Sequence, residues 1–188
     1  MRSDDDSSRG ARPARSRRDW LRTTAGLALG AGMGGWLQLA RASSLAVGRP
    51  APGIVLHTLD GKSIASDDLR GSIVILTFWA TWCEPCRTEL PLLSAYAGRY
   101  ATQGLRVLGF SLDGAENLPD VQHVAAGLSF PVGLLGSAYA GDYGRIWRIP
   151  VNFTIDRNGI LVDNGWDDRK PAWTAERFER IVVPLLSR

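Results

Sequence analysis

The sequence predicts an α/β domain with a mixed central β-sheet flanked by helices and a β-hairpin extension at its N-terminal side. The first observation is that two apolar, β-rich runs, 73–79 and 105–111, alternate with helix-compatible segments at 84–102 and 118–126. This succession is typical of α/β chains in which crossover helices connect neighbouring strands. The second observation is that a strong β-hairpin signal precedes these strands and helices and another follows them. Each hairpin predicts a pair of antiparallel strands.

Each further element follows from a local signal. Asp60-Gly61 and Asn158-Gly159 are hairpin turn signals. Apolar residues recur at near-helical spacing after residue 84, and Pro91 predicts a kink there. Thr174 is suited to cap a last helix. The expected elements are strands 54–57 and 63–65, a turn at 67–71, strand 73–79, helix 84–102, strand 105–111, helix 118–126, strand 130–135, a short helix or turn at 138–147, strands 151–155 and 160–163, and helix 174–186.

The N-terminal segment has the features of an export signal. The run 16–22 contains Arg17-Arg18 and resembles a twin-arginine motif. A weakly apolar, glycine-interrupted stretch follows, and Ala40-Arg41-Ala42 fits a small-residue cleavage site. We therefore expect residues 1–42 to be a twin-arginine-type signal peptide, 43–53 a linker, and 54–188 the folded domain. An uncleaved anchor or a disordered basic tail is the alternative for the first segment.

The charge of the chain changes when this segment is set aside. The whole chain has a formal net charge of +3, but its first 42 residues hold eight arginines and four aspartates. The remainder carries fourteen basic and fifteen acidic residues, so its net charge is −1. A basic stripe for nucleic acid is absent from this composition, and we expect no nucleic-acid partner.

Cys83-Glu84-Pro85-Cys86 contains both cysteines of the chain and stands where an apolar strand meets a helix. A helix N-terminus favours a thiolate on the first sulfur, because unpaired N–H groups and the helix dipole stabilise negative charge. The second cysteine, about one turn later, is placed to resolve a mixed disulfide. Pro85 suits the first helical turn because it lacks an N–H. The motif therefore predicts a redox-active disulfide and no other cofactor.

Two alternatives to redox chemistry are weaker. Structural zinc needs four ligands, whereas no further cysteine exists and His57 and His123 are isolated in the sequence. We therefore predict no metal site. An inert disulfide between Cys83 and Cys86 closes too short a loop to constrain much chain entropy.

The segment from Phe78 to Pro91 resembles the active site of thioredoxin-fold proteins, and is most similar to exported TlpA/ResA/DsbE-like thiol–disulfide oxidoreductases. The resemblance extends from about Pro52 to the C-terminus and includes Ile149-Pro150 and the hairpin after it. It implies a thioredoxin-like fold in which Pro150 is cis and faces the cysteines. It also implies that the Ile149 backbone pairs with a substrate peptide beside Cys83.

Two acidic residues lie near the thiols, and the resemblance concerns one of them, Glu89. Glu89 follows Cys86 by three residues, where related exported reductases carry an acidic residue that shuttles protons. A surface position for Glu89 is the alternative. Glu84 lies inside the ring and opposes a thiolate, which favours a reductant. Cytosolic thioredoxins have a buried Asp six residues before the first cysteine, but this chain has Thr77 there, which does not titrate. A second departure is Val151-Asn152, which is expected to alter substrate pairing.

The tryptophans divide into two groups. Trp82 is expected to shield the ring and to contact a substrate, and Trp79 is expected in the core. We interpret Trp147, Trp166 and Trp173 as packing residues. His57 and His123 are expected to be surface or packing residues.

Four functions compete. The first is a periplasmic reductase, acting as a monomer on disulfide-bearing exported proteins of the cytochrome c or copper-centre assembly type, with electrons from a membrane thiol donor. The second is a disulfide donor or isomerase. The third is a peroxide reductase, disfavoured because Ala80 replaces the expected Thr. The fourth is a non-enzymatic module that binds Cu(I) on the two thiolates.

Overall fold

The computed structural model describes residues 45–187, so the predicted signal peptide lies outside the described residues. Within them, a five-stranded sheet has the order β5-β4-β3-β6-β7, and a separate two-stranded hairpin has the order β1-β2. The strands are β1 (Val55–His57), β2 (Ser63–Ala65), β3 (Ile73–Trp79), β4 (Leu105–Ser111), β5 (Val132–Leu134), β6 (Val151–Ile155) and β7 (Leu161–Asn164). The predicted mixed sheet and N-terminal hairpin are confirmed.

The centre of the sheet is β3, all seven residues of which are buried. It is parallel to β4 on one side and antiparallel to β6 on the other, and β5 extends the parallel half. Because β3 and β4 run in the same direction, their C-terminal ends lie at the same edge of the sheet. The segment with the two cysteines follows β3 at that edge.

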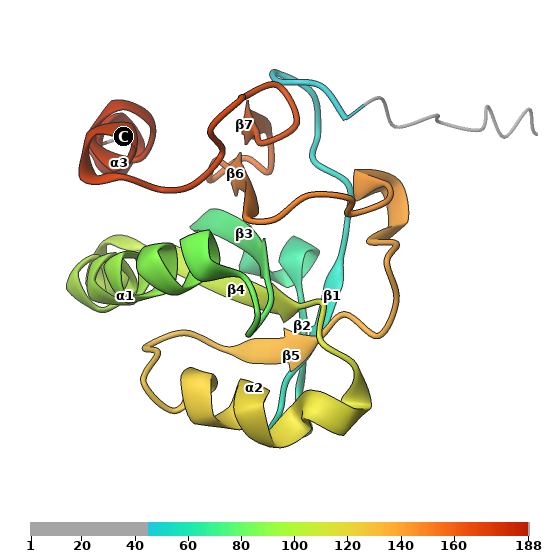
Figure 1. Ribbon diagram of the computed structural model, residues 1–188. Coiled ribbons are helices and arrows are strands. Elements are labelled where there is room, and N and C mark those ends of the chain that lie inside the picture. The colour runs from blue at the N-terminus through green and yellow to red at the C-terminus, as the bar shows by residue number, and fades with distance from the viewer. Residues whose placement is uncertain (1–44, 188) are drawn as a thin grey trace, which may run out of the picture. The chain divides into compact units, whose positions relative to one another are not determined.

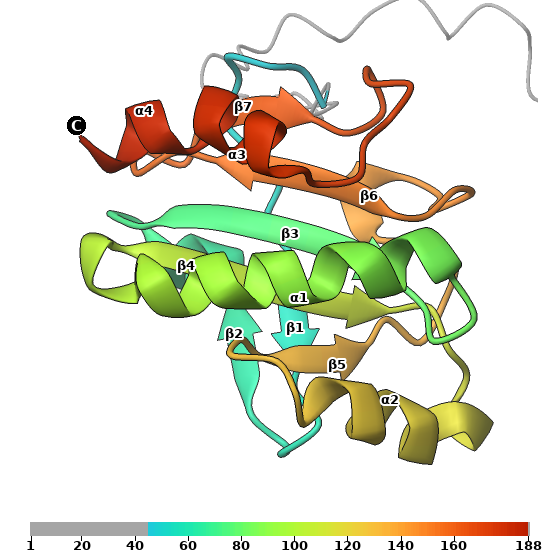
Figure 2. The same cartoon turned by 60° about the vertical axis from the view of Figure 1, so that its left-hand side comes forward.

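Helices cover one face of the sheet (Figures 1 and 2). The helix α1 (Glu84–Arg99) lies across β3 and β4, and α3 (Ala175–Ile181) lies on the same face near β6 and β7. The helix α2 (Leu118–Ala125) lies beside β5, and α4 (Val183–Leu186) ends the described chain. A core cluster on this face includes both cysteines and residues of all three longer helices.

A second core cluster fills the opposite face of the sheet. Its members come from β3, β4, β6, β7 and the hairpin, and from the segment around the 3-10 turn Gly141–Tyr143. Phe78 lies at its centre, stacked on Phe110 with ring centroids 5.0 Å apart and edge-on to Phe153 at 5.9 Å. Both faces are thus covered, which explains why β3 reads as a continuous apolar run.

Several predicted boundaries need correction. The helix α1 runs through Pro91 but ends at Arg99, and a 3-10 turn, Ala101–Gln103, replaces its expected last residues. The expected strand 130–135 is only three residues long. The predicted last helix divides into α3 and α4, because Pro184 has no N–H to continue the helical hydrogen bonds.

Part of the predicted linker belongs to the folded domain. The N–H of Gly48 donates to the carbonyl of Leu161 at 2.8 Å, and the N–H of Leu161 donates to the carbonyl of Arg49 at 2.9 Å. Pro50 forms an antiparallel bridge with Ile160. These bonds cover the free edge of β7, so the domain begins before residue 54. Among the described residues, no helix is long and apolar enough to cross a membrane.

Candidate active site

The two cysteines are joined by a disulfide at the start of α1. Cys83 is the N-cap of the helix, and its sulfur accepts a hydrogen bond from the N–H of Cys86 at 3.2 Å. Pro85 occupies the first turn, where its missing N–H leaves no partner unsatisfied. The first-turn N–H groups and the helix dipole therefore face the Cys83 sulfur, and both stabilise a thiolate there once the disulfide is reduced.

The surroundings of the two sulfurs differ. Cys86 is fully buried, whereas Cys83 is 5 % exposed beside Trp82, whose side chain is 68 % exposed. Glu84 and Pro85, between the cysteines, are exposed as well. The ring is therefore accessible from the side of Cys83, whereas the Cys86 side chain has no contact with solvent.

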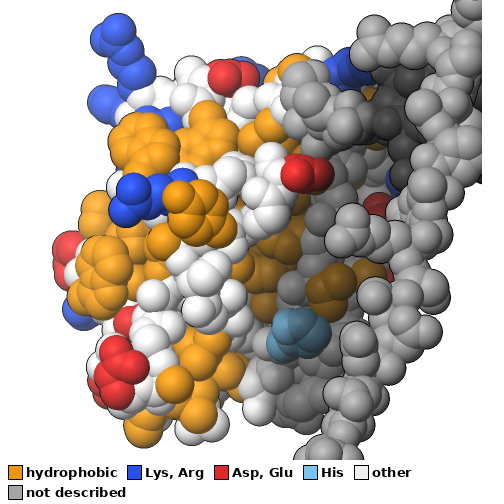
Figure 3. All heavy atoms as spheres, turned by 90° about the vertical axis from the view of Figure 1, so that its right-hand side faces the viewer, with side chains coloured by type: hydrophobic (Ala, Val, Ile, Leu, Met, Phe, Trp, Pro, Cys, Tyr) orange, Lys and Arg blue, Asp and Glu red, His pale blue; other side chains and the backbone are white. Residues whose placement is uncertain are grey.

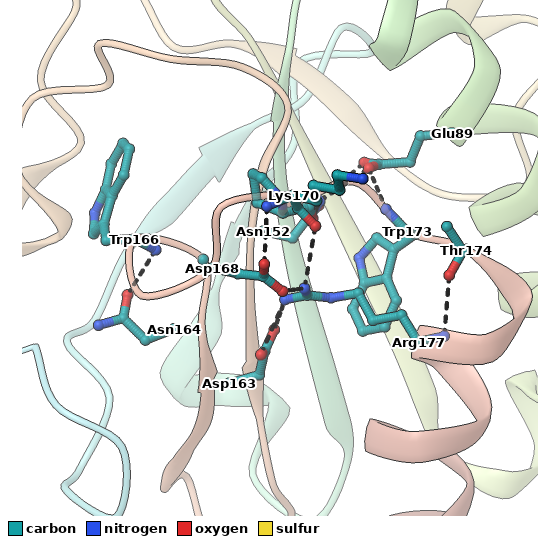
Figure 4. A network of polar contacts seen from close by, with 12 residues as sticks. Glu89, Asn152, Asp163, Asn164, Trp166, Asp168, Lys170, Trp173, Thr174 and Arg177 are labelled. Atoms are coloured by element: carbon teal, nitrogen blue, oxygen red, sulfur yellow. Dashed lines mark hydrogen bonds and ion pairs between the residues drawn. The ribbon is translucent and has the colours of Figure 1, made fainter.

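Glu89 is the buried carboxylate of α1 that follows Cys86. It lies one turn after Cys86 on α1, and it is only 2 % exposed. Its carboxylate accepts hydrogen bonds from the Trp173 N–H at 2.6 Å and from the Asn152 amide at 3.1 Å (Figure 4). The Thr77 hydroxyl donates at 3.2 Å. The surface alternative for Glu89 is thus wrong: the side chain points from α1 toward the sheet and meets Thr77, the residue that stands where cytosolic thioredoxins have Asp.

Burial raises the pKa of Glu89 to about 7. Loss of hydration is the largest cause, and the hydrogen bonds from Trp173, Asn152 and Thr77 act in the opposite direction. A carboxyl group with a pKa near neutral can accept a proton and return it at the same pH, which is what a general acid–base group requires. The Thr77 hydroxyl can rotate to accept from the protonated acid or donate to the carboxylate, so it suits both states.

Asn152 was predicted to affect substrate pairing, and the structure places it elsewhere. It is fully buried, and its amide nitrogen bridges Glu89 and the carbonyl of Pro171 at 2.9 Å. Its contacts therefore hold the carboxylate of Glu89 and the loop before α3. In the sequence the residue is a departure from the family pattern, and no local signal indicates its contact with Glu89.

The Ile149-Pro150 peptide bond is cis, as the resemblance implied. Ile149 packs against the core cluster that contains Cys83 and Cys86. Pro150 and Pro85 line one groove, so the segment before β6 and the first turn of α1 are neighbours. Among the described residues, no backbone hydrogen bond involves Ile149, which leaves its amide and carbonyl available to an extended peptide.

A second buried carboxylate, Asp113, fixes the loop before the cysteines. It accepts hydrogen bonds from the N–H of Thr81 at 2.9 Å and from its hydroxyl at 2.6 Å. The hydroxyl of Ser111, the last residue of β4, also donates to it, at 2.6 Å. Sequence analysis missed this contact, although a polar pair directly after a buried strand, at the edge where β3 also ends, was a usable signal.

An ion-pair network centred on Arg177 lies next to Trp173, the residue whose N–H donates to Glu89 (Figure 4). Arg177 of α3 is 3 % exposed and donates to both oxygens of Asp163, at 2.8 and 3.0 Å, and to Asp168. Its guanidinium lies over the Trp173 ring, 5.2 Å from the centroid. The network ties α3, β7 and the 168–173 loop together and holds the N–H of Trp173 toward Glu89. It was not predicted.

The remaining site predictions have mixed outcomes. Trp79 and Trp173 are buried as expected, and His57 and His123 are exposed. The packing role of Trp147 is wrong: its side chain is 69 % exposed and stacks on Trp166, with centroids 5.6 Å apart. The cause is the covalent neighbour Arg148, whose guanidinium is held by backbone carbonyls and lies 5.2 Å over the Trp147 ring. Within the described residues, no group of three His, Cys, Asp or Glu side chains forms a metal site.

Comparisons with known proteins agree with this geometry. A model of the AhpC/TSA family matches residues 47–164. The thiol-disulfide oxidoreductase ResA of Bacillus thuringiensis is 34% identical over 118 residues, which cover 62% of this chain and 68% of the relative. The ResA of Bacillus subtilis is 31% identical over 119 residues, covering 63% and 66% of the two chains.

Solved structures give the same fold. A putative thiol:disulfide interchange protein DsbE from Chlorobium tepidum has a TM-score of 0.64 and 28% identity, covering 76% of this chain and 99% of its own. A thioredoxin family thiol:disulfide interchange protein from the same organism has a TM-score of 0.63 and 31% identity, with coverages of 73% and 96%. The predicted thioredoxin-like fold is therefore confirmed. The chain belongs to the AhpC/TSA family and, within the thioredoxin superfamily, to the TlpA/ResA/DsbE-like thiol–disulfide oxidoreductases.

Proposed function

We propose that this thiol–disulfide oxidoreductase works as a periplasmic reductase of disulfides in exported proteins. The observation that carries the proposal is the buried carboxylate of Glu89, one turn after the fully buried Cys86. A site that stabilises the thiolate makes a protein a stronger oxidant, because it stabilises the reduced form relative to the disulfide. A buried carboxylate beside the thiols opposes thiolate formation by like-charge repulsion, and this favours a reductant.

The reduction proceeds in two exchanges. The Cys83 thiolate attacks one sulfur of the client disulfide, a mixed disulfide forms, and the client's other sulfur leaves as a thiolate that takes a proton. Cys86 then loses its proton to Glu89 and attacks the Cys83 sulfur. The Cys83–Cys86 disulfide forms, and the second client sulfur leaves as a thiolate. Two electrons pass to the client, and Glu89 later releases its proton.

Client recognition is proposed for the residues that surround Cys83. Ile149, ahead of the cis Pro150, offers its backbone to an extended client segment, and the exposed Trp82 offers an apolar contact. Glu84 and Pro85 complete the surface between the cysteines. By the resemblance to its relatives, the client class is cytochrome c or copper-centre assembly proteins.

Several further parts of the proposal rest on the sequence. The twin-arginine-type segment 1–42 supports export, and an exported reductant requires a membrane thiol donor for its electrons. The protein is proposed to act as a monomer, with the Cys83–Cys86 disulfide as its sole redox group and without a metal or nucleic-acid partner.

The reduction potential of the Cys83–Cys86 pair tests the direction. The protein is equilibrated with glutathione and dithiothreitol buffers, and the reduced fraction is followed by tryptophan fluorescence. A value near or below about −270 mV, the thioredoxin range, supports the reductase. A value near about −120 mV assigns the protein to the disulfide donors instead.

The roles of the two cysteines are tested by trapping. Cys86→Ala removes the resolving thiol, so a mixed disulfide between Cys83 and a client is expected to accumulate in cell extracts. Cys83→Ala is the matched control and is expected to trap none. Equal trapping by the two variants would contradict Cys83 as the attacking residue.

A further inference from the structure

A groove of about 630 Å³ runs from the redox ring along the C-terminal part of the domain. At one end lie Pro85, Ile149 and Pro150, the residues that surround the approach to Cys83. The loop 168–172 and the exposed side of α3 form the rest of its wall. The groove therefore lies next to the redox ring, where the chain that flanks a client cysteine can enter it.

The charge of this groove is strongly positive. Its lining contains five basic side chains and two acidic ones, which leaves three formal positive charges. The basic residues are Arg148, Arg169, Lys170, Arg177 and Arg180, and the acidic residues are Asp168 and Glu176. The chain after residue 42 has a net charge of −1, so this concentration is local and opposite in sign to the domain.

Two of the basic residues have a structural role. Arg177 is buried against Asp163 and Asp168. Arg148 donates to the carbonyls of Gly165 and Asp168, each at 2.6 Å. They anchor the loop and α3, so the wall of the groove is preformed.

The other three basic residues are available to a partner. In the described part of the chain, Arg169, Lys170 and Arg180 form no ion pair with a carboxylate, and all three are exposed. Figure 3 shows the domain from the side away from α3, where some Lys and Arg side chains lie beside apolar ones. Exposed cations that form no ion pair within the described residues suit an anionic peptide better than a neutral or basic one.

We propose that this groove selects clients that carry Asp or Glu residues next to their reactive cysteine. The proposal rests on the reductase function above and adds its substrate class. The client's extended segment lies along Ile149, and its carboxylates meet Arg169, Lys170 and Arg180. Attraction between opposite charges raises the rate of encounter by about tenfold or more at low salt, and the gain falls as salt screens it.

The test uses three synthetic peptides with the same disulfide, flanked by Glu, Gln or Lys. Second-order rate constants for their reduction by the reduced protein are measured by stopped-flow tryptophan fluorescence, at low and high salt. We expect the Glu peptide to react about tenfold faster than the Gln peptide at low salt, and the Lys peptide to react slowest.

Variants assign the preference to the groove. Arg180→Gln and the double variant Arg169→Gln/Lys170→Gln are expected to lower the Glu-to-Gln rate ratio about threefold or more. Arg99→Gln is the matched control, because Arg99 also lies in the last turn of a helix but at the end of α1 far from Cys83. It is expected to keep the wild-type ratio.

The possible failures are distinguishable. Equal rates for the three peptides, or a preference that survives the groove variants, would overturn the acidic-client proposal and leave the reductase function in place. A reduced protein that reacts with none of the peptides would overturn the reductase function and the groove together.

Discussion

Glu84 and Glu89 carry the same carboxyl group on the same helix, five residues apart, in opposite environments. Glu84 is exposed in the first turn of α1, where its side chain pairs with Arg87 at 3.6 Å across solvent. Glu89 is 2 % exposed and accepts hydrogen bonds from three different residues. The helical period turns one carboxylate toward water and the other toward the sheet.

Burial, and not proximity to the cysteines in sequence, is therefore the reason that we propose Glu89 and not Glu84 for proton transfer. Water and salt screen the charge of Glu84, although it stands between the two cysteines. Glu89 is surrounded by a medium of low dielectric, in which its negative charge interacts strongly with a nearby thiolate. Burial in this medium also raises the pKa of Glu89 to about 7.

The largest expected effect is on stability against pH. The pKa of Glu89 is raised from 4.5 to about 7 on folding, so the folded state binds its proton more tightly than the unfolded state. The stabilisation by this proton is fully present below pH 4.5 and is lost as the pH rises to about 7. The free energy of urea unfolding of the oxidised protein should fall by up to about 3 kcal/mol across this range, relative to Glu89→Gln. Parallel profiles for the two proteins would contradict a buried, titrating Glu89.

The next effect is on the rate of client reduction. Glu89→Gln cannot take the proton of Cys86, which has no contact with water, so single-turnover reduction of a disulfide peptide should slow by about 10² at pH 7. Glu84→Gln is the matched control and should change the rate by less than about twofold, because its charge is screened. Equal slowing by the two variants would contradict the proposal that Glu89, and not Glu84, accepts the proton of Cys86.

A smaller effect is expected from Asn152→Ala. The variant removes one of the three donors to Glu89 and the Asn152 donor to the buried Pro171 carbonyl, so unfolding should become easier by about 1–3 kcal/mol. Loss of a hydrogen bond to the carboxylate also raises the pKa of Glu89, and the pH step in stability should move to higher pH. Thr77→Val removes a longer and weaker bond and serves as a milder comparison. A step that moves to lower pH would contradict the assignment.

The smallest effect is expected from the exposed pair. Arg87→Gln removes the partner of Glu84, and the free energy of unfolding should change by less than about 0.5 kcal/mol. Chemical denaturation at low and high salt measures this. A decrease in the free energy of unfolding above about 1 kcal/mol would contradict a weak, solvent-screened pair between Arg87 and Glu84.

Local sequence patterns predicted most of the fold. The central strand, the two hairpins and the start of α1 each have a signal within a few residues, namely an apolar run, an Asx-Gly turn or a cap. The exposed position of Trp147 had no such signal, because it depends on Arg148 being held by carbonyls of the 165–168 segment. Contacts of that kind join residues far apart in sequence.

The candidate site divides in the same way. The cysteine pair, Pro150 and the relevance of Glu89 followed from the motif and its resemblance. The hydrogen bonds between Asp113 and Thr81 could not be predicted without the register of β3 against β4. The Arg177 network could not be predicted without the position of α3 beside β7. The burial of Glu89 was left open because it depends on Asn152 and Trp173, 63 and 84 residues away.

The most direct test of the account is the titration of Glu89 by carbon NMR in protein labelled at the glutamate carboxyl carbons. The oxidised state is used, because disulfide-bonded cysteines do not titrate, and Glu89→Gln identifies the resonance. We expect a midpoint near pH 7. A midpoint near 4.5, the ordinary value, would contradict a buried carboxylate that exchanges protons with Cys86.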